Sequence, residues 1–486
     1  MFLRDLIAEL KIVHINGSLD LDISDIAYDS RKVKKNALFV CIDGTTVDGH
    51  LFIKQAYENG AVAFLTSRET KIPVGTTEIR IDNTRSGLAY VVDRFFEHPT
   101  GKLPLIGVTG TKGKTTTAFM IKQILEAEGK KVGLIGTIAN MIGCEILYTE
   151  RTTPEAYDLQ ALFCEMIEKK TDMAVMEVSS QGVMLDRVAC CEFAFGIFTN
   201  IESDHIGPNE HKDFEDYFTQ KLRFLPMCKK VLINADMNLV ERVKQASPGG
   251  YVTYGFENPA DFSATNIIAK PNSVEFDVET PNWSDKIVLS VPGKFNVSNA
   301  LAAIAVCTLA GVSLDSIKFG LANFKVKGRT EIVYSCPDYT VMIDYAHNSM
   351  SLESLLKSVR DYAPGRIVCL FGCGGNRDRS RRFEMGEVSG KYSDFTIITS
   401  DNPRNEDPDA IINDIEIGIN KTIGDYIKIT NRPEAMKYAI QHAKKEDIII
   451  FAGKGHETYQ IFKDKTIHFD EREIVAQILE ELGEET

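Results

Sequence analysis

Short apolar runs alternate with segments of helical spacing over most of the chain. Between 102 and about 329 the runs lie at 105–109, 173–178, 193–198 and 230–234, and beyond 330 they recur at 340–344, 366–371, 395–399 and 447–451. The segments between them place apolar residues on one side of a helix, as at positions 120, 121, 124 and 125. This alternation predicts an α/β protein with largely parallel sheets and helices on their faces.

Three stretches of the chain differ in their pattern. At 486 residues the chain is too long for one hydrophobic core, and its length predicts about three domains. Residues 1–98 mix short strand-like runs with turn clusters, and Pro99 and Gly101 mark a linker before the first long α/β segment. We therefore predict domains at 1–98, 99–329 and 330–486.

A Gly/Thr/Lys-rich turn follows the apolar run 105–109 and precedes a helical pattern. Gly110 and Gly113 let backbone N–H groups approach phosphate oxygens, and the helix beginning near Thr115 adds its positive N-terminal end. Lys114 can reach the terminal phosphates, and Thr115 can ligate Mg²⁺. Val108 stands where the strict G-x4-G-K-[ST] pattern has its first Gly, so the motif is a shortened variant. An ordinary glycine turn is the alternative, but Lys-Thr directly after the second Gly favours a phosphate loop, and we expect ATP.

Polar residues gather where the runs 173–178 and 193–198 end. Glu177 closes an apolar strand, so its carboxylate must be paired or bound to a metal, and His205 on the next loop is a similar candidate. Because the carboxyl ends of parallel strands share one edge of a sheet, both should face the same crevice as the phosphate loop. Taken singly, each residue is more commonly a satisfied structural group, but together with the phosphate loop they favour a metal site.

Other polar positions have an ordinary explanation at this stage. Lys221 lies in an acidic and aromatic helical segment, where a solvated helix lysine is the default interpretation. Asn296 and Asn299 lie near the start of an Ala-rich helix, where Asn is common as a cap or turn residue. The polar stretches 28–31 and 43–50 are typical of solvated turns.

Beyond 330, polar residues again follow the apolar runs, at 344–348, 372–379, 400–404 and 453–457. Arg377 and Arg404 are suited to clamp a carboxylate, because a guanidinium binds one through two parallel hydrogen bonds. Surface arginines in loops are the alternative. Residues Asp407-Pro408 predict an N-cap followed by Pro in the first turn of the next helix.

Composition and charge exclude several classes of protein. The formal charge of −14 argues against a nucleic-acid partner held by a broad basic surface. The N-terminal segment carries charge throughout, and we expect neither a signal segment nor insertion into a membrane. The ten cysteines are scattered, and the adjacent pair Cys190-Cys191 lacks the spacing of a zinc site. Reduced thiols and a cytoplasmic location are the simpler expectation.

Six motifs, in this order along the whole chain, resemble those of the Mur ligases. Within that family the chain is most similar to the members that add the third residue of the peptidoglycan stem peptide. The motifs are Thr109-Gly-Thr-Lys-Gly-Lys-Thr-Thr116, Glu177-Val-Ser-Ser180, Thr199-Asn200 with Asp204-His205, Gly293-Lys-Phe-Asn-Val-Ser-Asn299, Asp344-Tyr-Ala-His347 and Gly453-Lys-Gly-His-Glu457.

The resemblance implies an N-terminal domain for the UDP end of the substrate, a central ATPase and a Rossmann-like C-terminal domain that brings the incoming amino acid. It also implies an ATP- and Mg²⁺-dependent reaction on UDP-MurNAc-L-Ala-D-Glu. The γ-carboxylate of D-Glu becomes an acyl phosphate, and the amine of meso-diaminopimelate then displaces phosphate. The expected partners are these small molecules alone, and the expected state is a monomer.

The resemblance assigns roles to single residues. Lys114, Glu177, His205 and Lys221 match catalytic positions; Thr115, Glu177 and His205 match Mg²⁺ ligands, together with Lys221 as a CO₂-derived carbamate. Residues matching the ATP site are Thr109, Gly110, Thr111, Lys112, Gly113, Lys114, Thr115, Thr116, Asn299, Asp344 and His347. Those matching the UDP-muramoyl dipeptide site are Ser30, Thr45, Thr46, Val47, Thr152, Thr153, Ser179 and Arg187. Those matching the amino-acid pocket are Arg377, Asp401, Asn402, Pro403, Arg404, Gly453 and Glu457.

The tetrad Asp401-Asn-Pro-Arg404 resembles the signature of the diaminopimelate-adding branch, in which the arginine would grip the second carboxylate that lysine lacks. The same ligation with L-lysine or a lanthionine-like diamino acid is an alternative. A folylpolyglutamate synthase, which also forms an acyl phosphate from ATP, is a more distant alternative. The full N-terminal domain and this tetrad weaken that interpretation. A non-catalytic nucleotide-binding paralogue is the remaining alternative, and it would not release ADP.

Overall fold

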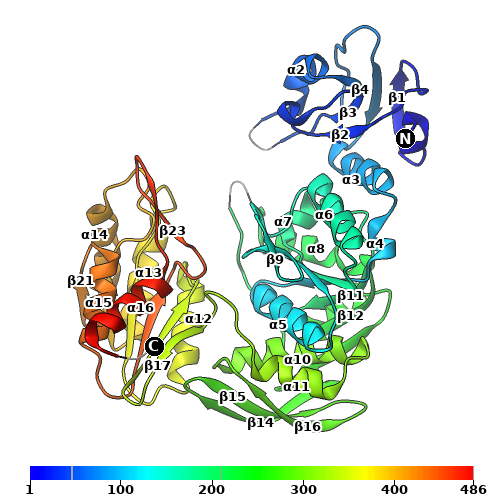
Figure 1. Cartoon of the computed structure of the whole chain (residues 1–486). Helices are drawn as coiled ribbons and strands as arrows, with labels where there is room; N and C mark the ends of the chain where they lie inside the picture. Colours follow the sequence, from blue (N-terminus) through cyan, green and yellow to red (C-terminus); the bar gives the residue numbers. More distant parts are fainter. Residues whose placement is uncertain (45–46, 208–209, 485–486) are drawn as a thin grey trace. The chain divides into compact units, whose positions relative to one another are not determined.

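The computed structural model describes residues 1–44, 47–207 and 210–484. The chain divides into two compact units, Met1–Phe262 with Ala302–Ile317 and Ser263–Leu301 with Lys318–Thr486. Both are built largely from parallel sheets with helices against them (Figure 1), which confirms the predicted α/β class. The predicted domain boundaries at 98/99 and 329/330 stay a prediction. Within the described part of the chain, no helix has both the length and the apolar character to cross a bilayer.

The first unit begins with a sheet in the order β1-β5-β4-β3-β2, parallel except for β1. Its strands are β1 (Ile12–Asn16), β2 (Asp25–Ala27), β3 (Ala37–Val40), β4 (Ala61–Thr66) and β5 (Thr77–Ile81), and the helices around it are α1 (Leu3–Leu6), α2 (Ile53–Glu58), α3 (Thr84–Phe95) and α4 (Pro99–Lys102). Leu38 and Leu65 pack with α1 and α3, whereas Phe39 and Phe64 pack with α2. The sheet is therefore covered on both faces.

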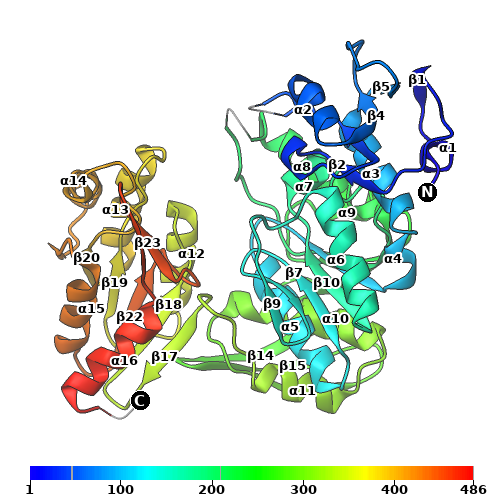
Figure 2. The ribbon, with the colours of Figure 1, turned by 45° about the horizontal axis from the view of Figure 1, so that its top comes forward.

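A second sheet in the same unit has the order β13-β12-β11-β6-β10-β7-β8-β9, in which β13 to β7 are parallel. Its strands are β6 (Leu105–Thr109), β7 (Val132–Ile135), β8 (Asn140–Ile142), β9 (Glu145–Leu147), β10 (Met173–Glu177), β11 (Phe193–Phe198), β12 (Cys228–Asn234) and β13 (Tyr251–Gly255). The helices are α5 (Lys114–Ala127), α6 (Ala156–Glu168), α7 (Ser180–Met184), α8 (Phe214–Leu222) and α9 (Val240–Gln245), shown from a second direction in Figure 2.

The order of these strands determines where the polar loops meet. The strands β6, β10 and β11 are neighbours and parallel, so the phosphate loop and the segments after Glu177 and Phe198 leave the sheet at one edge. All residues of β6 are buried, which explains its continuous apolar run. Gly113, with φ of +83°, occupies the N-cap of α5, and only glycine adopts this left-handed conformation without strain.

The second unit contains an antiparallel meander and a larger sheet in the order β17-β18-β22-β19-β20-β21, parallel except for β17. The meander strands are β14 (Phe262–Lys270), β15 (Ser273–Glu279) and β16 (Ser284–Leu289), followed by helices α10 (Lys294–Leu309) and α11 (Leu314–Ala322). Residues Ala302–Ile317, which include the second half of α10 and the start of α11, belong to the first unit. The larger sheet comprises β17 (Glu331–Ser335), β18 (Tyr339–Asp344), β19 (Ile367–Phe371), β20 (Phe395–Ile398), β21 (Tyr426–Lys428) and β22 (Asp447–Ala452), and a hairpin of β23 (Tyr459–Ile461) and β24 (Thr466–His468) follows.

Both faces of the larger sheet are covered by helices. Helices α12 (Ser349–Arg360), α13 (Ser380–Tyr392) and α14 (Pro408–Ile419) bury one face, with Cys369 and Ile450 among its side chains. Helices α15 (Arg432–Gln441) and α16 (Glu471–Leu482) bury the other, with Leu370 and Ile449 (Figure 1). Neighbouring residues of a strand point to opposite faces, so these strands are apolar at every position rather than alternately.

A buried ion pair joins the helices of the second face to the loop-bearing ends of the strands. Arg432 Nε donates to Glu471 Oε1 at 2.8 Å, and both side chains are fully buried. The guanidinium also donates to the carbonyl oxygens of Ala452 at 2.9 Å and Ser400 at 3.4 Å. Burial raises the pKa of Glu471, although the arginine opposes this shift. The pair thereby braces the starts of the loops after β20 and β22.

Replacing Arg432 with Met should lower the free energy of unfolding by about 3–5 kcal/mol, because it leaves a buried carboxylate and two carbonyl groups without their donor. Urea unfolding of the full chain, followed by circular dichroism, measures this change.

The matched control is Arg360→Met, which removes the pair of Arg360 with Asp394 between half-exposed side chains. We expect this control to cost less than about 1 kcal/mol, because exposed pairs are screened by water. Equal losses in the two variants would contradict the bracing role of Arg432.

Candidate active site

The phosphate loop between β6 and α5 is closed by its own lysine and by the segment after β11. Lys114 Nζ donates to the carbonyl oxygens of Gly110 at 2.8 Å and Thr111 at 3.0 Å. The Lys112 N–H donates to Asn200 Oδ1 at 2.8 Å, and the Thr199 hydroxyl donates to the Lys112 carbonyl at 2.7 Å. The loop residues predicted to bind ATP therefore lie in one braced turn at the carboxyl edge of the sheet.

Glu177 is buried at the end of β10 and is shared between two neighbouring loops. Its Oε2 accepts from the hydroxyls of Thr115 at 2.9 Å and Thr137 at 3.0 Å, and its Oε1 accepts from the Thr137 N–H at 2.9 Å. The Thr137 hydroxyl also lies 3.0 Å from Thr152 Oγ1. The structure thus brings together Glu177 and Thr115, two predicted Mg²⁺ ligands, and the oxygen donors they offer are those Mg²⁺ prefers.

Lys221 points into the same site from α8. The side chain is 1% exposed, its Nζ donates to the Gly110 carbonyl at 2.8 Å, and it lies 4.8 Å from the centre of the Tyr217 ring. Burial, and then the nearby Lys114 ammonium, hold the pKa of Lys221 well below its usual range. The default expectation of a solvated helix lysine is wrong, because the helix turns this residue toward the phosphate loop.

His205 lies apart from this cluster. Its side chain is about half exposed, its backbone φ is +55°, and its Nδ1 lies 3.2 Å from Glu210 Oε1. The ring also approaches that of Tyr217, with 6.0 Å between the ring centres. Among the residues that the structure describes, no hydrogen bond or ion pair joins His205 to Glu177. Its role as a metal ligand stays a prediction.

The residues predicted to hold the muramoyl dipeptide lie directly beside Glu177. The Thr153 hydroxyl donates to the Glu177 carbonyl at 2.9 Å and accepts from the Ser179 N–H at 3.0 Å. Arg187 Nη1 donates to the Thr153 carbonyl at 3.0 Å, and burial lowers the pKa of this arginine. Thr153 thus joins Ser179 and Arg187 to the backbone carbonyl of Glu177, whereas Thr152 reaches the carboxylate of Glu177 through Thr137.

Glu155 anchors Arg187 and connects the two sheets of the first unit. Its Oε1 lies 2.8 Å from Arg187 Nη2 and 2.8 Å from Arg151 Nη1, and its Oε2 lies 3.6 Å from Nη1 of Arg85 on α3. Three guanidinium groups thus surround one carboxylate that is almost fully buried. The position of Arg187 therefore depends on Glu155 at the start of α6, and through it on Arg85 of α3.

The remaining residues predicted for the UDP-muramoyl dipeptide site, Ser30, Thr45, Thr46 and Val47, come from the N-terminal part of the sequence. Thr45 and Thr46 lie outside the described residues, and Val47 next to them is exposed. The Ser30 hydroxyl, by contrast, is buried and donates to Gln55 Oε1 at 2.8 Å. The contact of Thr45, Thr46 and Val47 with a uridine and that of Ser30 with the muramoyl dipeptide stay predictions.

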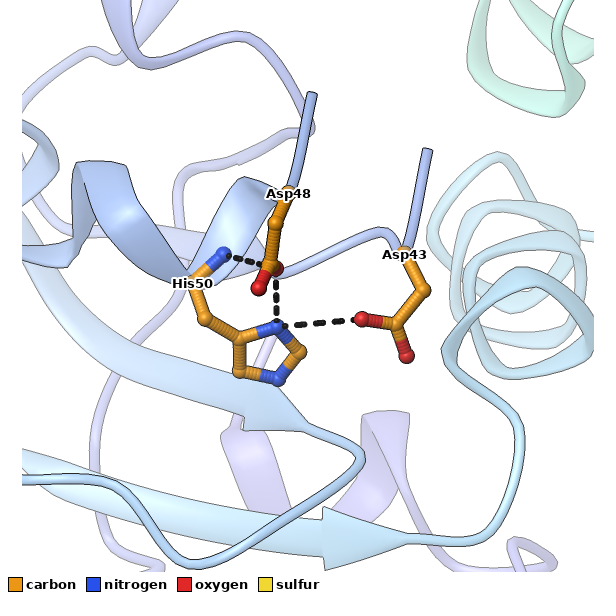
Figure 3. A group of neighbouring side chains, drawn as sticks. All are labelled: Asp43, Asp48 and His50. Atoms are coloured by element: carbon orange, nitrogen blue, oxygen red, sulfur yellow. Dashed lines mark hydrogen bonds and ion pairs between the residues drawn. The ribbon is translucent and has the colours of Figure 1, made fainter. Parts of the chain in front are cut away.

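Asp43, Asp48 and His50 gather beside this turn in an arrangement that resembles a metal site (Figure 3). His50 Nδ1 lies 2.7 Å from Asp48 Oδ1 and 3.5 Å from Asp43 Oδ1. The Ser67 N–H donates to His50 Nε2 at 3.1 Å, so Nδ1 carries the ring proton and has no lone pair for a metal. Arg68 pairs with both carboxylates. The hydrogen bond of His50 with Asp48 and the two pairs with Arg68 therefore account for the charges of both carboxylates.

In the second unit, Asp344 closes β18 as a fully buried carboxylate. It accepts from the N–H of Thr330 at 2.7 Å and of Ala346 at 2.8 Å, and burial raises its pKa. Thr330 adopts φ of +44°, an unfavourable conformation for a β-branched residue that this hydrogen bond helps to maintain. The ring of His347 packs against that of Tyr345, with 4.6 Å between centres. Asp344 and His347 thus lie on one loop.

Asn299, the third predicted nucleotide contact of this unit, lies in the second turn of α10 rather than at its cap. Its side-chain amide donates to Asn296 Oδ1 at 3.2 Å, and Asn296 Nδ2 in turn donates to the Pro292 carbonyl at 2.7 Å. These bonds orient both amides. A role in nucleotide binding stays a prediction.

All residues predicted for the amino-acid pocket lie on loops at the carboxyl edge of the larger sheet. Asn402 Nδ2 donates to Glu457 Oε2 at 2.9 Å, joining the loops after β20 and β22. Arg404 Nη1 donates to the Gly375 carbonyl at 2.8 Å, joining the loops after β20 and β19. Strand β19 lies between β20 and β22 in the sheet, so the loops that follow these three strands are neighbours. The pocket residues are Arg377 after β19, Asp401, Asn402, Pro403 and Arg404 after β20, and Gly453 and Glu457 after β22.

The arrangement has counterparts among proteins of known function. A ligase of Clostridium acetobutylicum named UDP-N-acetylmuramoyl-L-alanyl-D-glutamate--2,6-diaminopimelate ligase 1 is 44% identical over 485 residues, covering 99% of this chain and 100% of that protein. A ligase of Caldanaerobacter subterraneus with the same name, without the numeral, is 45% identical over 482 residues, 99% of both chains. The chain belongs to the Mur ligase family.

Models of Mur ligase domains match most of the sequence. The Mur ligase family catalytic domain matches residues 22–95, the middle domain 108–307 and the glutamate ligase domain 328–455. A solved structure titled as that of a UDP-N-acetylmuramoyl-L-alanyl-D-glutamate--2,6-diaminopimelate ligase is similar over the whole length of both chains, with a TM-score of 0.73 and 25% identity. The three-part Mur ligase architecture expected from the sequence is thus confirmed as a fold.

Several residues of this Mur ligase site were missed by the sequence analysis. Thr137 donates twice to Glu177, Tyr217 contacts both Lys221 and Thr111, and Glu155 holds Arg187. Thr137 lies two residues after the apolar run of β7, so the rule that polar residues at strand ends face the ligand edge would have found it. Nothing in the local pattern marks Tyr217 or Glu155.

Gly136→Ala should lower the rate of ATP turnover by roughly 100-fold, because a misplaced catalytic group commonly costs that much. A Cβ at position 136 would lie 2.3 Å from Glu177 Oε1 and would push the carboxylate away from Thr115 and Thr137. Steady-state ADP release measures the effect.

Gly101→Ala is the matched control, because a Cβ there meets nothing within 4 Å. The control should retain full activity, and both variants should unfold at nearly the same temperature as the parent. Undiminished turnover in Gly136→Ala would show that the position of Glu177 does not matter.

Proposed function

We propose that this protein is an ATP-dependent amide ligase that joins meso-diaminopimelate to the γ-carboxyl group of D-Glu in UDP-MurNAc-L-Ala-D-Glu, a step of peptidoglycan precursor synthesis. The observation that carries this conclusion is the likeness, over the full length of both chains, to ligases named for this reaction. We place the reaction in the cytoplasm, where ATP and nucleotide sugars are available. The partners are small molecules, and we expect the chain to act as a monomer.

In the first half-reaction an oxygen of the γ-carboxylate attacks the γ-phosphorus of ATP, and ADP leaves. The phosphate loop holds the nucleotide, and the Lys114 ammonium, next to the Gly110 and Thr111 carbonyls, is placed to attract its terminal phosphates. In the second half-reaction the amine attacks the acyl carbon, the amine loses a proton and phosphate leaves. A carboxylate needs this activation because its oxygen is otherwise a poor leaving group.

The residues at the carboxyl edge of the central sheet suit Mg²⁺. Glu177 and Thr115 present oxygen atoms that are already hydrogen-bonded to each other, and we assign both as ligands, with His205 from the neighbouring loop. Bound Mg²⁺ supplies positive charge that offsets the negative charge developing during phosphoryl transfer.

Lys221 is suited to become a carbamate. The reactive form of a lysine toward CO₂ is the neutral amine, and burial favours that form here. The amine nitrogen bonds to the carbon of CO₂ and releases one proton, so the product is an anion. This change replaces a buried neutral amine next to Lys114 with an anion that can bind a metal.

Arg404 is the residue that we propose binds the second carboxylate of the amino acid. Arg404 has a left-handed backbone conformation, with φ of +52°. Its guanidinium donates to the Gly375 carbonyl. A guanidinium fixed in this way leaves further N–H groups for a substrate carboxylate. L-lysine would leave those donors unsatisfied, whereas a lanthionine-like diamino diacid would satisfy them.

Phosphate release from ATP, with UDP-MurNAc-L-Ala-D-Glu and one added amine at a time, tests the proposal. The specificity constant for meso-diaminopimelate should exceed that for L-lysine by at least about 10⁴-fold, the discrimination typical of sites that bind a polar group the competitor lacks. Lanthionine should be accepted at a rate close to that of diaminopimelate.

Arg404→Ala is the control for this comparison and should reduce the preference while leaving the Michaelis constant for ATP nearly unchanged. A preference for lysine in the parent protein would keep the ligase reaction and exclude diaminopimelate as its amine. No phosphate release with any amine would favour a non-catalytic nucleotide-binding protein.

Lys221→Ala should abolish turnover, because it removes both the amine that reacts with CO₂ and the buried contact with the Gly110 carbonyl. Short-chain carboxylic acids added in millimolar amounts should restore part of the activity by supplying the missing carboxylate. Steady-state ADP release with and without acetate measures the rescue.

The control is Lys244→Ala, which removes a partly exposed lysine of α9 that pairs with Glu241. This variant should retain activity and show no response to acetate. Full activity of Lys221→Ala without any acid would exclude the carbamate.

A further inference from the structure

Lys454 is a fully buried lysine in the loop that leaves β22, and none of the assignments above includes it. It lies between Gly453, with φ of +107°, and Gly455, with φ of +54°. Both glycines adopt left-handed conformations that other residues rarely adopt. The loop therefore turns sharply on either side of Lys454, and its side chain is held among the loops of the amino-acid pocket rather than in solvent.

The ammonium of Lys454 contacts three residues of the predicted amino-acid pocket. Nζ donates to Asn402 Oδ1 at 3.2 Å and to Glu457 Oε2 at 3.1 Å, and it lies 3.5 Å from Asp401 Oδ1. The rings of Tyr459 and Phe469 lie within 6 Å of the same nitrogen, at 5.8 and 5.6 Å from ring centre to Nζ. One cation thus joins the loops after β20 and β22.

These contacts orient Asn402 and Glu457 together. Asn402 Oδ1 accepts from both Lys454 Nζ and the Ile461 N–H, so its Nδ2 must face Glu457, to which it donates at 2.9 Å. Glu457 Oε2 then receives two donors. In the described part of the chain no hydrogen bond engages Glu457 Oε1, which leaves this oxygen for an ammonium group of the substrate.

Lys454 also sets the charge of the pocket. Asp401 and Glu457 are two carboxylates close to one buried nitrogen, and Arg404 is the nearby cation assigned to the substrate. Together with Arg377, the other predicted pocket cation, these side chains sum to +1 with Lys454 and to zero without it. A more negative pocket disfavours an amino acid with two carboxylates more than one with a single carboxylate, because the additional carboxylate meets additional repulsion.

We propose that Lys454 is a positioning residue that holds Asn402 and Glu457 in place and, by offsetting the charge of Asp401 and Glu457, favours a diamino acid with two carboxylates over one with a single carboxylate. The proposal rests on the proposed function, because it concerns the amino-acid pocket of that reaction. In this proposal Arg404 contacts the substrate directly, and Lys454 is a second cation that acts through Asn402 and Glu457.

Lys454→Met tests the proposal, since Met keeps most of the aliphatic stem and removes the charge. Calorimetric titration of the full chain with meso-diaminopimelate, in the presence of UDP-MurNAc-L-Ala-D-Glu and a non-hydrolysable ATP analogue, measures affinity without turnover. Competition with L-lysine in the same titration gives the preference between the two amino acids. We expect the affinity for diaminopimelate to fall about 10- to 100-fold, the preference over lysine to fall at least about 10-fold, and the affinity for the ATP analogue to stay within about twofold.

Lys437→Met is the matched control, because Lys437 is an exposed lysine of α15 in the same unit, paired with Glu481 at 2.6 Å. It should change none of these quantities. Lys454→Gln provides a second neutral variant that keeps a hydrogen-bond donor. It should show the same loss of preference with a smaller loss of affinity.

Equal losses for diaminopimelate and lysine would overturn the proposal, and so would failure of both Lys454 variants to fold, because either result makes the lysine purely structural. If the parent protein binds diaminopimelate but releases no phosphate, the proposed function fails while the titrations still decide the role of Lys454. If the parent protein binds neither amino acid, both proposals are overturned.

Discussion

A buried carboxylate, that of Glu177, is the constraint on which the site of the first unit depends. An anion removed from water must be satisfied by donors, and here the donors come from the start of α5 and from the loop after β7. Satisfying Glu177 therefore fixes three neighbouring strand ends relative to one another. Thr152 reaches this carboxylate through Thr137, and Thr153 binds the backbone carbonyl of the same residue, so the phosphate loop and the residues predicted to hold the dipeptide meet at Glu177.

The second unit uses buried charge in a comparable way but with different partners. Asp344 is satisfied by backbone N–H groups, Lys454 by side-chain oxygens, and Arg432 by Glu471 and two carbonyl groups. Asp344 and Lys454 lie where a parallel strand ends and a loop begins, and Arg432 reaches such loops from the start of α15. Parallel sheets collect loops at one edge, and ionised side chains in the loops then determine which atoms face a ligand. Fold and site are coupled through the need to satisfy these charges.

The sequence predicted the strands of both α/β segments well because buried parallel strands are continuous apolar runs, and each run from 105–109 to 447–451 overlaps a strand. It also predicted the phosphate loop, whose glycines and lysine lie within a few residues of one another. The local pattern did not place Lys221, which only the resemblance assigned to the site, because nothing in its own helix reveals that α8 packs beside Gly110, 111 residues earlier. Glu155 was missed for the same reason, whereas Thr137 could have been found from its place after β7. The cluster of Asp43, Asp48 and His50 shows the converse, since its residues are close in sequence yet Arg68 and Ser67 decide its chemistry.

The close approach of backbone to side chain around the phosphate loop has a consequence for inhibitor resistance. A Cβ at Gly110 would lie 1.9 Å from the hydroxyl oxygen of Thr199, which itself braces the loop. Any substitution there that blocked a compound bound in the loop would also displace a group that shapes it. The same holds for Gly136, which directly follows β7 and whose added Cβ would meet the buried carboxylate of Glu177. Few substitutions could therefore give resistance to compounds that bind these backbone surfaces rather than the exposed side chains around them.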